Sequence, residues 1–224
     1  LRESYRDATL LRRANESLAQ EIEARGRLEP EPGENARRDA LTGISNRRHF
    51  YDMADQAFAQ ARAKGAPLSL LIADIDYFRQ IGDTYGHPHG DEVIKALARA
   101  CRATLGDVDM LARLGGEEFV MLLPGADLAA ASAVAERLRL EVRRTPVRRR
   151  EGTLHFTISL GVAQWQPGES LPALMRRADE ALYAARHPGG DRMAAANGQV
   201  GPGTLEPGRP GDENTSRNST GGPS

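Results

Sequence analysis

The sequence has little cysteine, almost no net charge and no long apolar run, and each shortage excludes a class of protein. Among its 224 residues Cys101 is the only cysteine, so neither a disulfide framework nor a cysteine-rich zinc site can form. The formal net charge of -1 gives no general attraction to nucleic acids or anionic membranes. No apolar run approaches the roughly 20 residues that span a bilayer, and no signal peptide is visible. We therefore expect a cytoplasmic protein with no nucleic-acid partner and no membrane segment in this chain.

The first 28 residues have the spacing of a coiled coil. Two seven-residue series, offset by three positions, are formed by Leu1, Ala8, Asn15 and Ile22 and by Leu11 and Leu18. We predict that residues 1–28 form a stalk helix that holds a parallel homodimer, with Asn15 fixing the register. A solvated amphipathic helix packed on its own domain is the alternative.

Composition divides the rest of the chain. Pro30 and Pro32 end the predicted helix, and residues 29–36 are predicted to form a linker. Residues 37–193 are predicted to form one globular domain. Residues 194–224 are rich in Gly, Pro, Asn and Ser and are predicted to be a disordered tail, with a remainder of cloning as the alternative. Because the chain opens without a methionine, it is expected to be a fragment, and an upstream sensor or membrane segment would not be visible.

Hydrophobic periodicity within the globular part predicts an α/β sandwich, in the α+β sense, with helices packed on a central, mainly antiparallel sheet. Its elements are expected in the order β-α-α-β-β-α-β-α. The clearest helical patterns cover residues 46–64, 91–105, 128–143 and 171–186. Strand patterns cover residues 68–73, 110–114, 119–123 and 154–163, and two glycines between the second and third predict a hairpin.

Two acidic clusters stand at predicted strand ends. Asp74-Ile75-Asp76 closes the first strand, and Gly115-Gly116-Glu117-Glu118 forms the hairpin tip. If the strands are neighbours, the carboxylates are crowded, so either their pKa values rise or a hard cation lies between them. Mg²⁺ prefers few carboxylates together with substrate phosphates, and glycines without Cβ atoms let a nucleotide approach the backbone. A surface hairpin with solvated acids is the alternative.

Six segments in this order resemble the motifs of GGDEF domains, the catalytic domains of diguanylate cyclases. They are DALTGISNRR at 39–48, DIDYFR at 74–79, YGHPHGD at 85–91, GGEEF at 115–119, ISLGVA at 158–163 and ADEALY at 178–183. The resemblance covers about residues 37–193. It implies a fold like that of nucleotidyl cyclases and polymerase palm domains.

The resemblance also implies a reaction. Diguanylate cyclases condense two GTP molecules into cyclic di-GMP and two pyrophosphates, with Mg²⁺ or Mn²⁺, where the active sites of two subunits face each other. A stalk dimer would raise the effective concentration of one half-site for the other. A regulatory protein acting on the stalk is the expected source of control. The alternative is a catalytically silent GGDEF domain that binds nucleotide or a protein as a regulatory module.

The family's functional residues can be carried over to the matching positions. The expected metal ligands are Asp74, the carbonyl of Ile75, and Glu117. The expected catalytic residues are Glu117 as acid–base, Glu118 in support, and Arg79. The expected substrate-binding positions are Asp91, His87 and Gly82 for guanine, the main chain of Tyr77 and Phe78 with Arg186 for the triphosphate, and Gly115 and Gly116 at the hairpin.

Several positions depart from the family pattern. Gly82 stands where an Asn usually reads guanine, and Gly190 stands where an Arg usually binds phosphate. Both favour the silent alternative, which the intact metal ligands oppose. Arg79 and Arg186 replace lysines, which keeps the charge but changes its geometry. Gly106 replaces the arginine of the product-binding Arg-x-x-Asp motif, so weak feedback inhibition is predicted.

Some conspicuous residues have simpler interpretations. The His87-Pro88-His89 pair is not expected to bind metal, because it lies within the substrate-loop motif. Arg148-Arg149-Arg150 is expected to be a solvated turn. Trp165 and Cys101 are expected to pack in the core.

Overall fold

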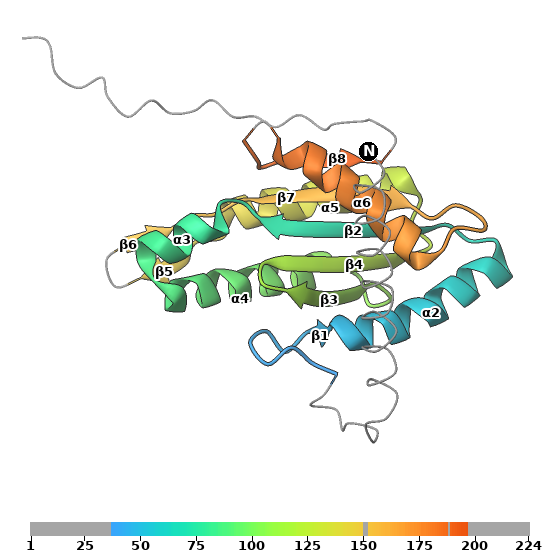
Figure 1. Ribbon diagram of the computed structural model, residues 1–224, viewed down its shortest axis with the longest axis horizontal. Coiled ribbons are helices and arrows are strands. Elements are labelled where there is room, and N and C mark those ends of the chain that lie inside the picture. Colours follow the sequence, from blue (N-terminus) through green and yellow to red (C-terminus); the bar gives the residue numbers. More distant parts are fainter. Residues whose placement is uncertain (1–36, 150–151, 188, 197–224) are drawn as a thin grey trace, which may run out of the picture.

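The computed structural model describes residues 37–149, 152–187 and 189–196. A six-stranded sheet with the order β1-β3-β4-β2-β7-β8 forms the middle layer, and helices cover both of its faces (Figure 1). The helices are α2 Arg47–Lys64, α3 Phe78–Tyr85, α4 His87–Thr104, α5 Leu128–Arg144 and α6 Leu171–Arg186. The strands are β1 Ser45–Asn46, β2 Leu68–Ile75, β3 Met110–Gly115, β4 Glu118–Pro124, β5 Val147–Arg149, β6 Gly152–Leu154, β7 Ile158–Gln164 and β8 Met193–Ala195.

The sheet is mainly antiparallel, as the sequence predicted. The central strand β2 runs antiparallel to both β4 and β7, and β3 runs antiparallel to β4. The two edge strands, β1 and β8, pair parallel to their neighbours. The strands β5 and β6 form a separate two-stranded hairpin.

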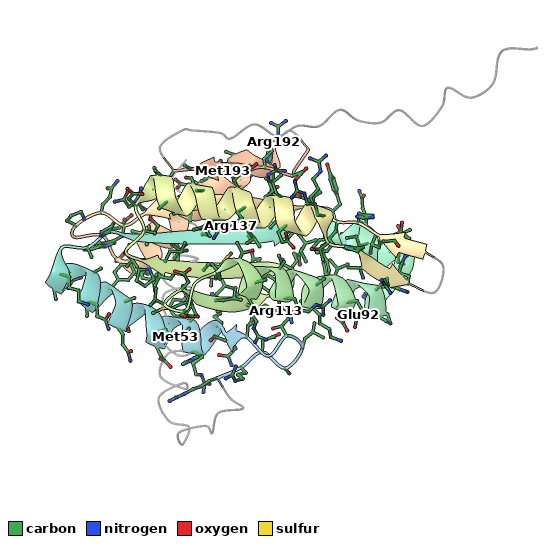
Figure 2. All side chains as sticks on the ribbon, turned by 180° about the vertical axis from the view of Figure 1, so that it is seen from behind. Met53, Glu92, Arg113, Arg137, Arg192 and Met193 are labelled. Carbon is green, nitrogen blue, oxygen red and sulfur yellow. The ribbon has the colours of Figure 1, made fainter. Side chains whose placement is uncertain are left out.

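The continuous apolar run of β2 is explained by its two covered faces. Leu71, Ala73 and Ile75 face a core beneath α3, α4 and α5, whereas Leu70 and Ile72 face a second core beneath α2 and α6. Figure 1 shows α2 and α6 in front of the sheet, and Figure 2 shows α4 and α5 from behind. A strand that is buried on both faces needs apolar residues at every position, instead of the usual alternation.

Local capping fixes the ends of the longer helices. The side chain of Asn46 accepts a hydrogen bond from the His49 amide at 3.0 Å and starts α2, while Gly65 ends it at a φ of 61°. Asp127 caps α5 in the same way, through the Ala130 amide at 2.8 Å. These side chains satisfy amides that have no partner in the first helical turn.

The predicted core residues are buried. Trp165 is 9% exposed and packs edge-on against Phe58, with ring centroids 5.8 Å apart. Cys101 is fully buried, and burial raises the pKa of its thiol to about 12. Both interpretations as packing residues are confirmed.

The structure differs from the sequence analysis at several element ends. The helix predicted from residue 91 begins at His87, because Pro88 fits the first turn of a helix. The strand predicted from residue 154 begins at Ile158. The predicted solvated turn at Arg148-Arg149-Arg150 is wrong for its first two residues, which belong to β5; the guanidinium of Arg149 lies 4.3 Å from the centre of the Tyr85 ring.

The C-terminal boundary also shifts. Ala194 and Ala195 belong to β8 and pair with β7, so the sheet continues past residue 193, where the predicted domain ended. The short apolar stretch after Arg192 is too brief to produce a readable strand pattern. The predicted stalk 1–28, the linker 29–36 and residues 197–224 of the predicted tail lie outside the described residues. Within the described ranges, no helix combines the length and apolar character needed to cross a membrane.

Candidate active site

The two acidic clusters meet at one edge of the sheet. Strand β2 pairs with β4, and the register places Asp74 opposite Glu118. Glu117 precedes Glu118 at the tip of the β3–β4 hairpin. The predicted neighbourhood of the two clusters is therefore confirmed, because β2 and β4 are adjacent in the sheet.

Asp74 has one satisfied and one unsatisfied oxygen. Its Oδ2 accepts a hydrogen bond from Arg186 Nη1 at 2.7 Å, so the end of α6 is tied to the end of β2. Its Oδ1 is buried and has no hydrogen-bond partner among the described residues. A buried carboxylate oxygen without a partner costs free energy, so this atom marks a place for a positively charged or donating ligand.

The electrostatic surroundings of Asp74 support the same conclusion. Burial raises the pKa of Asp74 to about 7 against the opposing effect of Arg186, and the neighbouring carboxylates of Glu117, Glu118 and Asp76 raise it further. A cation at this edge would favour the ionised form of Asp74 and relieve the repulsion.

The donor set fits an open site for a divalent metal ion better than a closed metal cage. Across the part of the chain that the structure describes, no three His, Cys, Asp or Glu side chains gather closely enough to enclose a metal ion. Mg²⁺ does not require such a cage, because it usually takes one or two carboxylates, several waters and substrate phosphates. The free Oδ1 of Asp74, the Ile75 carbonyl and Glu117 are donors of this kind.

The side chain of Arg113, which Figure 2 labels, holds the hairpin tip through hydrogen bonds. Its Nε and Nη2 donate to the carbonyl oxygen of Gly116 at 2.9 and 2.7 Å, and its Nη1 contacts both carboxylate oxygens of Asp39 at 3.1 Å. Burial acts on the pKa of Asp39 most strongly and would raise it, but hydrogen bonds from Thr42 and Arg113 together lower it. This link between the first motif and the GGEEF turn joins residues far apart in the chain, so no local sequence pattern predicts it.

The glycines of the turn leave open space, as expected. Gly116 has a φ of 46°, a backbone conformation that residues other than glycine rarely adopt. A Cβ atom at Gly115 or Gly116 would meet no atom within 4 Å. The backbone at this tip is therefore accessible to a ligand.

A cavity of about 500 Å³ adjoins the acidic edge. It is lined by Asp76, Tyr77, Tyr183, Arg186, His187 and Gly190. Tyr77 precedes α3, has a φ of 55° and donates its hydroxyl hydrogen to the Gly189 carbonyl at 3.1 Å. The first amides of α3, beginning at Phe78, follow this turn and have no intrahelical acceptors. The predicted positions Tyr77, Phe78 and Arg186 are thus brought to the same edge as Asp74.

The three predicted guanine positions lie on two successive helices. Gly82 is in α3, and a Cβ atom there would be 4.0 Å from His87 Nδ1 at the start of α4. Asp91 is exposed in the same helix as His87. Gly90 is buried, and a Cβ atom there would be only 3.2 Å from the Phe78 ring, so this glycine lets α3 and α4 pack closely.

Arg79 does not join the acidic cluster. Its side chain is 95% exposed, and its charged partner is Asp83, with the nitrogen and oxygen 3.9 Å apart. The structure therefore brings together the residues of β2, the hairpin and α6, and leaves the expected catalytic Arg79 on the surface of α3.

Comparison with known proteins assigns the family. The family model described as "Diguanylate cyclase, GGDEF domain" matches residues 36–192. The chain belongs to this family. The diguanylate cyclase DgcM from Escherichia coli K12 is 40% identical over 179 residues, which are 80% of this chain and 43% of DgcM. The chain therefore spans less than half the length of this relative.

Solved structures with the GGDEF fold agree with the sequence match. The GGDEF domain of DgcB from Caulobacter crescentus, solved in complex with c-di-GMP, has a TM-score of 0.70 and 38% identity, covering 72% of this chain and 96% of that one. The diguanylate cyclase SiaD from Pseudomonas aeruginosa, solved with its activator SiaC, also has a TM-score of 0.70. Its identity is 33%, over 87% of this chain and 73% of SiaD.

Within this GGDEF domain the structure separates the two aspartates of the β2 motif. Unlike Asp74, Asp76 has a fully occupied carboxylate: the hydroxyls of Thr157 and Ser159 and the amide of Asp191 each donate to it at 2.7 Å. In the sequence the two acids form one cluster. The structure gives Asp76 a structural role, tying β2 to β7 and to the loop after α6.

Gly190 packs directly on this network. It has a φ of 75°, and a Cβ atom there would lie 2.6 Å from the carboxylate of Asp76. The position that usually carries a phosphate-binding Arg is therefore filled here by backbone. The following residue, Asp191, is 2% exposed and has a φ of 51°.

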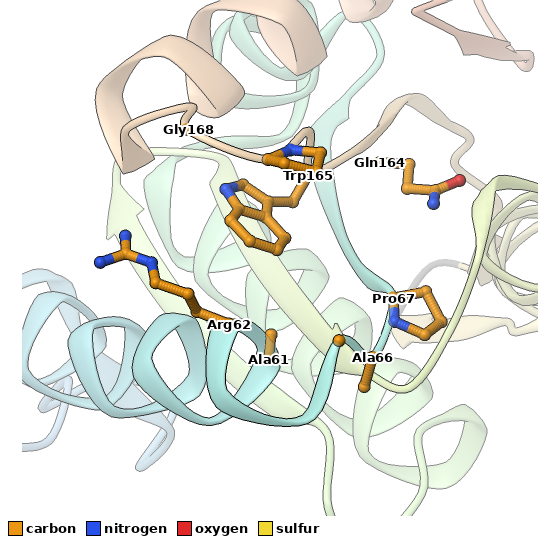
Figure 3. Close-up of a pocket in the computed structure, with 9 residues that line it drawn as sticks. Ala61, Arg62, Ala66, Pro67, Gln164, Trp165 and Gly168 are labelled. Carbon is orange, nitrogen blue, oxygen red and sulfur yellow. The ribbon is translucent and has the colours of Figure 1, made fainter.

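A larger cavity of about 640 Å³ lies at the opposite end of the sheet (Figure 3). It is bounded by the end of α2, the loop before β2 and the loop after β7, and Trp165 forms one wall. It contains none of the predicted site residues. Its other lining residues are Ala61, Arg62, Gly65, Ala66, Pro67, Gln164, Pro167 and Gly168.

Proposed function

We propose that this chain is a diguanylate cyclase that joins two GTP molecules into cyclic di-GMP and releases two pyrophosphates. The observation that carries the proposal is the buried, unpartnered Oδ1 of Asp74 beside the acidic tip of the β3–β4 hairpin. The membership of the chain in the GGDEF family supports the same activity.

Asp74, the Ile75 carbonyl and Glu117 would hold Mg²⁺ or Mn²⁺, the metal that neutralises charge on the triphosphate when it is bound. Glu117 acts as the general base and takes up the proton of the ribose 3′-hydroxyl. The 3′-oxygen then forms a bond to the α-phosphorus of the second GTP, and the bond to pyrophosphate breaks. Glu118, which pairs with Asp74 in the β2–β4 register, adds negative charge. This charge strengthens the binding of a metal cation at the site.

Phosphate recognition is assigned to the cavity beside Asp74. Arg186 is 42% exposed and uses Nη1 for Asp74, so its other guanidinium hydrogens remain available to phosphate oxygens. The first amides of α3, after Tyr77, have no intrahelical acceptors and lie at the positive end of the helix dipole, so they would donate to the same phosphate groups. Arg79 is exposed enough to turn toward a bound triphosphate.

Guanine recognition is assigned to the junction of α3 and α4. Asp91 accepts hydrogen bonds from the guanine N1–H and amino group, and His87 contacts the base edge. Gly82 leaves the space of a side chain unfilled, so discrimination depends more heavily on Asp91.

Each new bond joins the 3′-oxygen of one GTP to the α-phosphorus of the other. The active sites of two copies of the chain must therefore face each other. We propose that the stalk 1–28 provides this homodimer and that a regulatory protein acts through it in the cytoplasm. SiaD, a similar cyclase, was solved with an activator protein, which supports regulation by a partner. After deletion of residues 1–28 the chain should be mostly monomeric and much less active, and its specific activity should depend steeply on protein concentration. Activity is measured over a dilution series, and the oligomeric state is measured by sedimentation. A dimer of unchanged affinity after the deletion would contradict the role of the stalk.

The decisive experiment is incubation of the purified chain with GTP and Mg²⁺, followed by chromatography of the products. Cyclic di-GMP and pyrophosphate are expected in a 1:2 ratio. The silent regulatory alternative, favoured by Gly82 and Gly190, predicts GTP binding without either product. GTP binding without product would overturn the cyclase proposal in favour of this alternative, and absence of both binding and turnover would overturn both.

A further inference from the structure

Helix α5, which packs on the sheet, carries a buried charged side chain. Arg139 of α5 is 2% exposed and lies among the apolar residues that pack on the sheet. Its Nη1 donates to the carboxylate of Asp191, whose side chain is also 2% exposed, while Nε and Nη2 donate to Glu136 at 2.8 and 2.7 Å. Arg143 approaches the other carboxylate oxygen of Asp191 at 3.4 Å.

A buried ion pair of this kind is a costly way to stabilise a fold. The free-energy cost of removing two charges from water offsets much of their electrostatic attraction. Apolar residues of similar volume often stabilise a fold equally well. What such a pair provides is a fixed geometry, because removing either partner leaves the other buried charge with only its weaker or more exposed contacts, Glu136 for Arg139 and Arg143 for Asp191. The Arg139–Asp191 pair therefore defines where the loop after α6 must lie.

That loop is directly connected to the turn at the end of β2. The Asp191 amide donates to Asp76 Oδ2 at 2.7 Å, and the Gly189 carbonyl accepts the hydroxyl hydrogen of Tyr77 at 3.1 Å. Between them, Gly190 packs against the Asp76 carboxylate. The contacts thus run from Arg139, through the loop, to the turn that links β2 to α3.

Both ends of this connection have unfavourable backbone conformations. Among the described residues, Tyr77 and Asp191 are the two non-glycine positions with positive φ, at 55° and 51°. Such conformations persist only where surrounding contacts hold them. Here the same set of hydrogen bonds joins the two strained residues to each other's segments.

We propose that Arg139 and Asp191 form a positioning pair that holds the turn around Tyr77, and with it the 500 Å³ cavity, in the shape that receives the GTP phosphates. The inference rests on the proposed function and assigns a role to residues that touch no substrate. When the pair is broken, the turn samples other conformations, and GTP affinity falls in proportion to the fraction that remains competent.

The test compares Arg139→Met, Arg139→Lys and Asp191→Asn with the wild type, and uses Arg144→Met as the matched control. Arg144 is exposed in the last turn of the same helix. A non-hydrolysable GTP analogue with Mg²⁺ is titrated calorimetrically at a temperature where every variant is folded, and kcat and Tm are measured separately. Arg139→Met should weaken analogue binding about tenfold with kcat changed less than about twofold, because only the competent fraction changes.

Two further comparisons separate positioning from simple stabilisation. Arg139→Lys, which keeps the charge, should recover part of the affinity, and Arg139→Met with Asp191→Asn should bind no more weakly than Arg139→Met alone, because the two residues act as a unit. If Arg139→Met does not fold, the isosteric Asp191→Asn variant alone should show the loss of affinity. The Arg144→Met control should match the wild type.

The outcomes distinguish this inference from the proposed function. A lower Tm with unchanged affinity and kcat in the folded variants would reduce the pair to a structural role and overturn the inference. A fall in kcat with unchanged affinity would also overturn it. A wild-type chain that binds no GTP analogue would instead overturn the proposed function, before any variant is compared.

Discussion

The two ends of the sheet are built for different purposes, although the same strands run through both. At the end of β2 that carries Asp74, a buried oxygen lacks a partner and two non-glycine residues have positive φ. At the other end, Leu68 is fully buried and Trp165 packs against Phe58. The larger cavity, about 640 Å³, lies at this apolar end, and the cavity of about 500 Å³ lies at the acidic end.

The comparison shows that cavity volume alone does not locate the chemistry. Unsatisfied polar atoms and strained backbone cost stability, and proteins keep them where a ligand or reaction needs them. The acidic end of the sheet, which the smaller cavity adjoins, has both features: the unpartnered Oδ1 of Asp74 and the positive φ of Tyr77. The larger cavity is bounded mainly by apolar side chains and backbone, which require no ligand to be satisfied.

The largest expected effect is loss of catalysis at the acidic end. Asp74→Ala or Glu117→Ala should lower kcat at least about a thousandfold, because each removes a group that binds the metal or moves the proton. The free energy of unfolding should not fall at pH 7 or above in the absence of divalent metal, since these acids contribute repulsion instead of core packing. Steady-state product formation and urea unfolding measure the two quantities, with the exposed Asp107→Ala as control. Near-normal turnover by either variant would remove the proposed site.

The apolar end should respond in the opposite way. Trp165→Ala removes a buried ring and should lower the free energy of unfolding by about 3 kcal/mol. The kcat of the folded enzyme should stay within about twofold of the wild type, because the ring lies at the far end of β2 from Asp74. A large loss of kcat with the fold intact would show that the two ends are coupled, and the comparison would fail.

One glycine at each end of the sheet has positive φ, but the two differ in their surroundings. Gly168 borders the apolar cavity, has a φ of 86° and would meet no atom within 4 Å with a Cβ added. Gly190 has a φ of 75°, and its Cβ would meet the Asp76 carboxylate at 2.6 Å. Gly168→Ala should therefore cost about 1 kcal/mol from backbone strain, and Gly190→Ala should cost about 2 kcal/mol more, as measured by chemical unfolding.

The same clash predicts that the family's usual arginine cannot be restored. Gly190→Arg should raise the KM for GTP, because the turn must move before the new cation can reach a phosphate. Equal costs for the two alanine variants, or a lower KM for Gly190→Arg, would mean that the Asp76 network yields easily.

The acidic end should also give the stability a distinctive pH dependence. The pKa of Asp74 is raised to about 7 in the folded state, chiefly by burial, so the native protein keeps a proton that the unfolded chain releases. Stability from this group is complete below the unfolded pKa near 4 and is lost as the pH rises through about 7. The loss should be about 2–4 kcal/mol in the absence of divalent metal.

Asp74→Asn should lack this component. The difference in unfolding free energy between wild type and variant is measured by urea titration from pH 4 to pH 8 in chelator, with the exposed Asp107→Asn as control. The difference should shift in favour of the variant as the pH rises. Parallel curves for wild type and Asp74→Asn would contradict the buried, unpartnered state of this carboxyl group.

The sequence predicts those parts of the molecule in which local pattern and environment agree. Helix α6 has the predicted bounds, and the apolar run of β2 correctly indicated a doubly covered strand. The acidic edge could be predicted because its residues follow strand ends. By contrast, the partners of Asp76 come from Thr157, Ser159 and Asp191, so no local pattern distinguishes it from Asp74.

One missed feature did leave a signal. Arg139 occupies a position on α5 between Ala135 and Val142, at the spacing of the buried face. A charged residue at such a position predicts a buried ion pair, although its partner cannot be identified from spacing alone. Helix α3 is short and contains Gly82, which gives it too weak a periodicity to predict its ends.

The smallest expected effect concerns guanine recognition. Gly82 lies within helix α3, its φ is not positive, and an added Cβ would come no closer than 4.0 Å to His87 Nδ1, so the position does not require glycine. Gly82→Asn should therefore fit, improve the helix and supply an amide to the base. We expect the KM for GTP to fall about threefold to tenfold, which corresponds to about one hydrogen bond, with kcat unchanged. Gly82→Ala is the matched control, since it changes the helix without adding an amide. If both variants lower KM equally, helix order and not base contact is responsible; a raised KM for Gly82→Asn alone would show that the open space beside His87 is itself part of the guanine site.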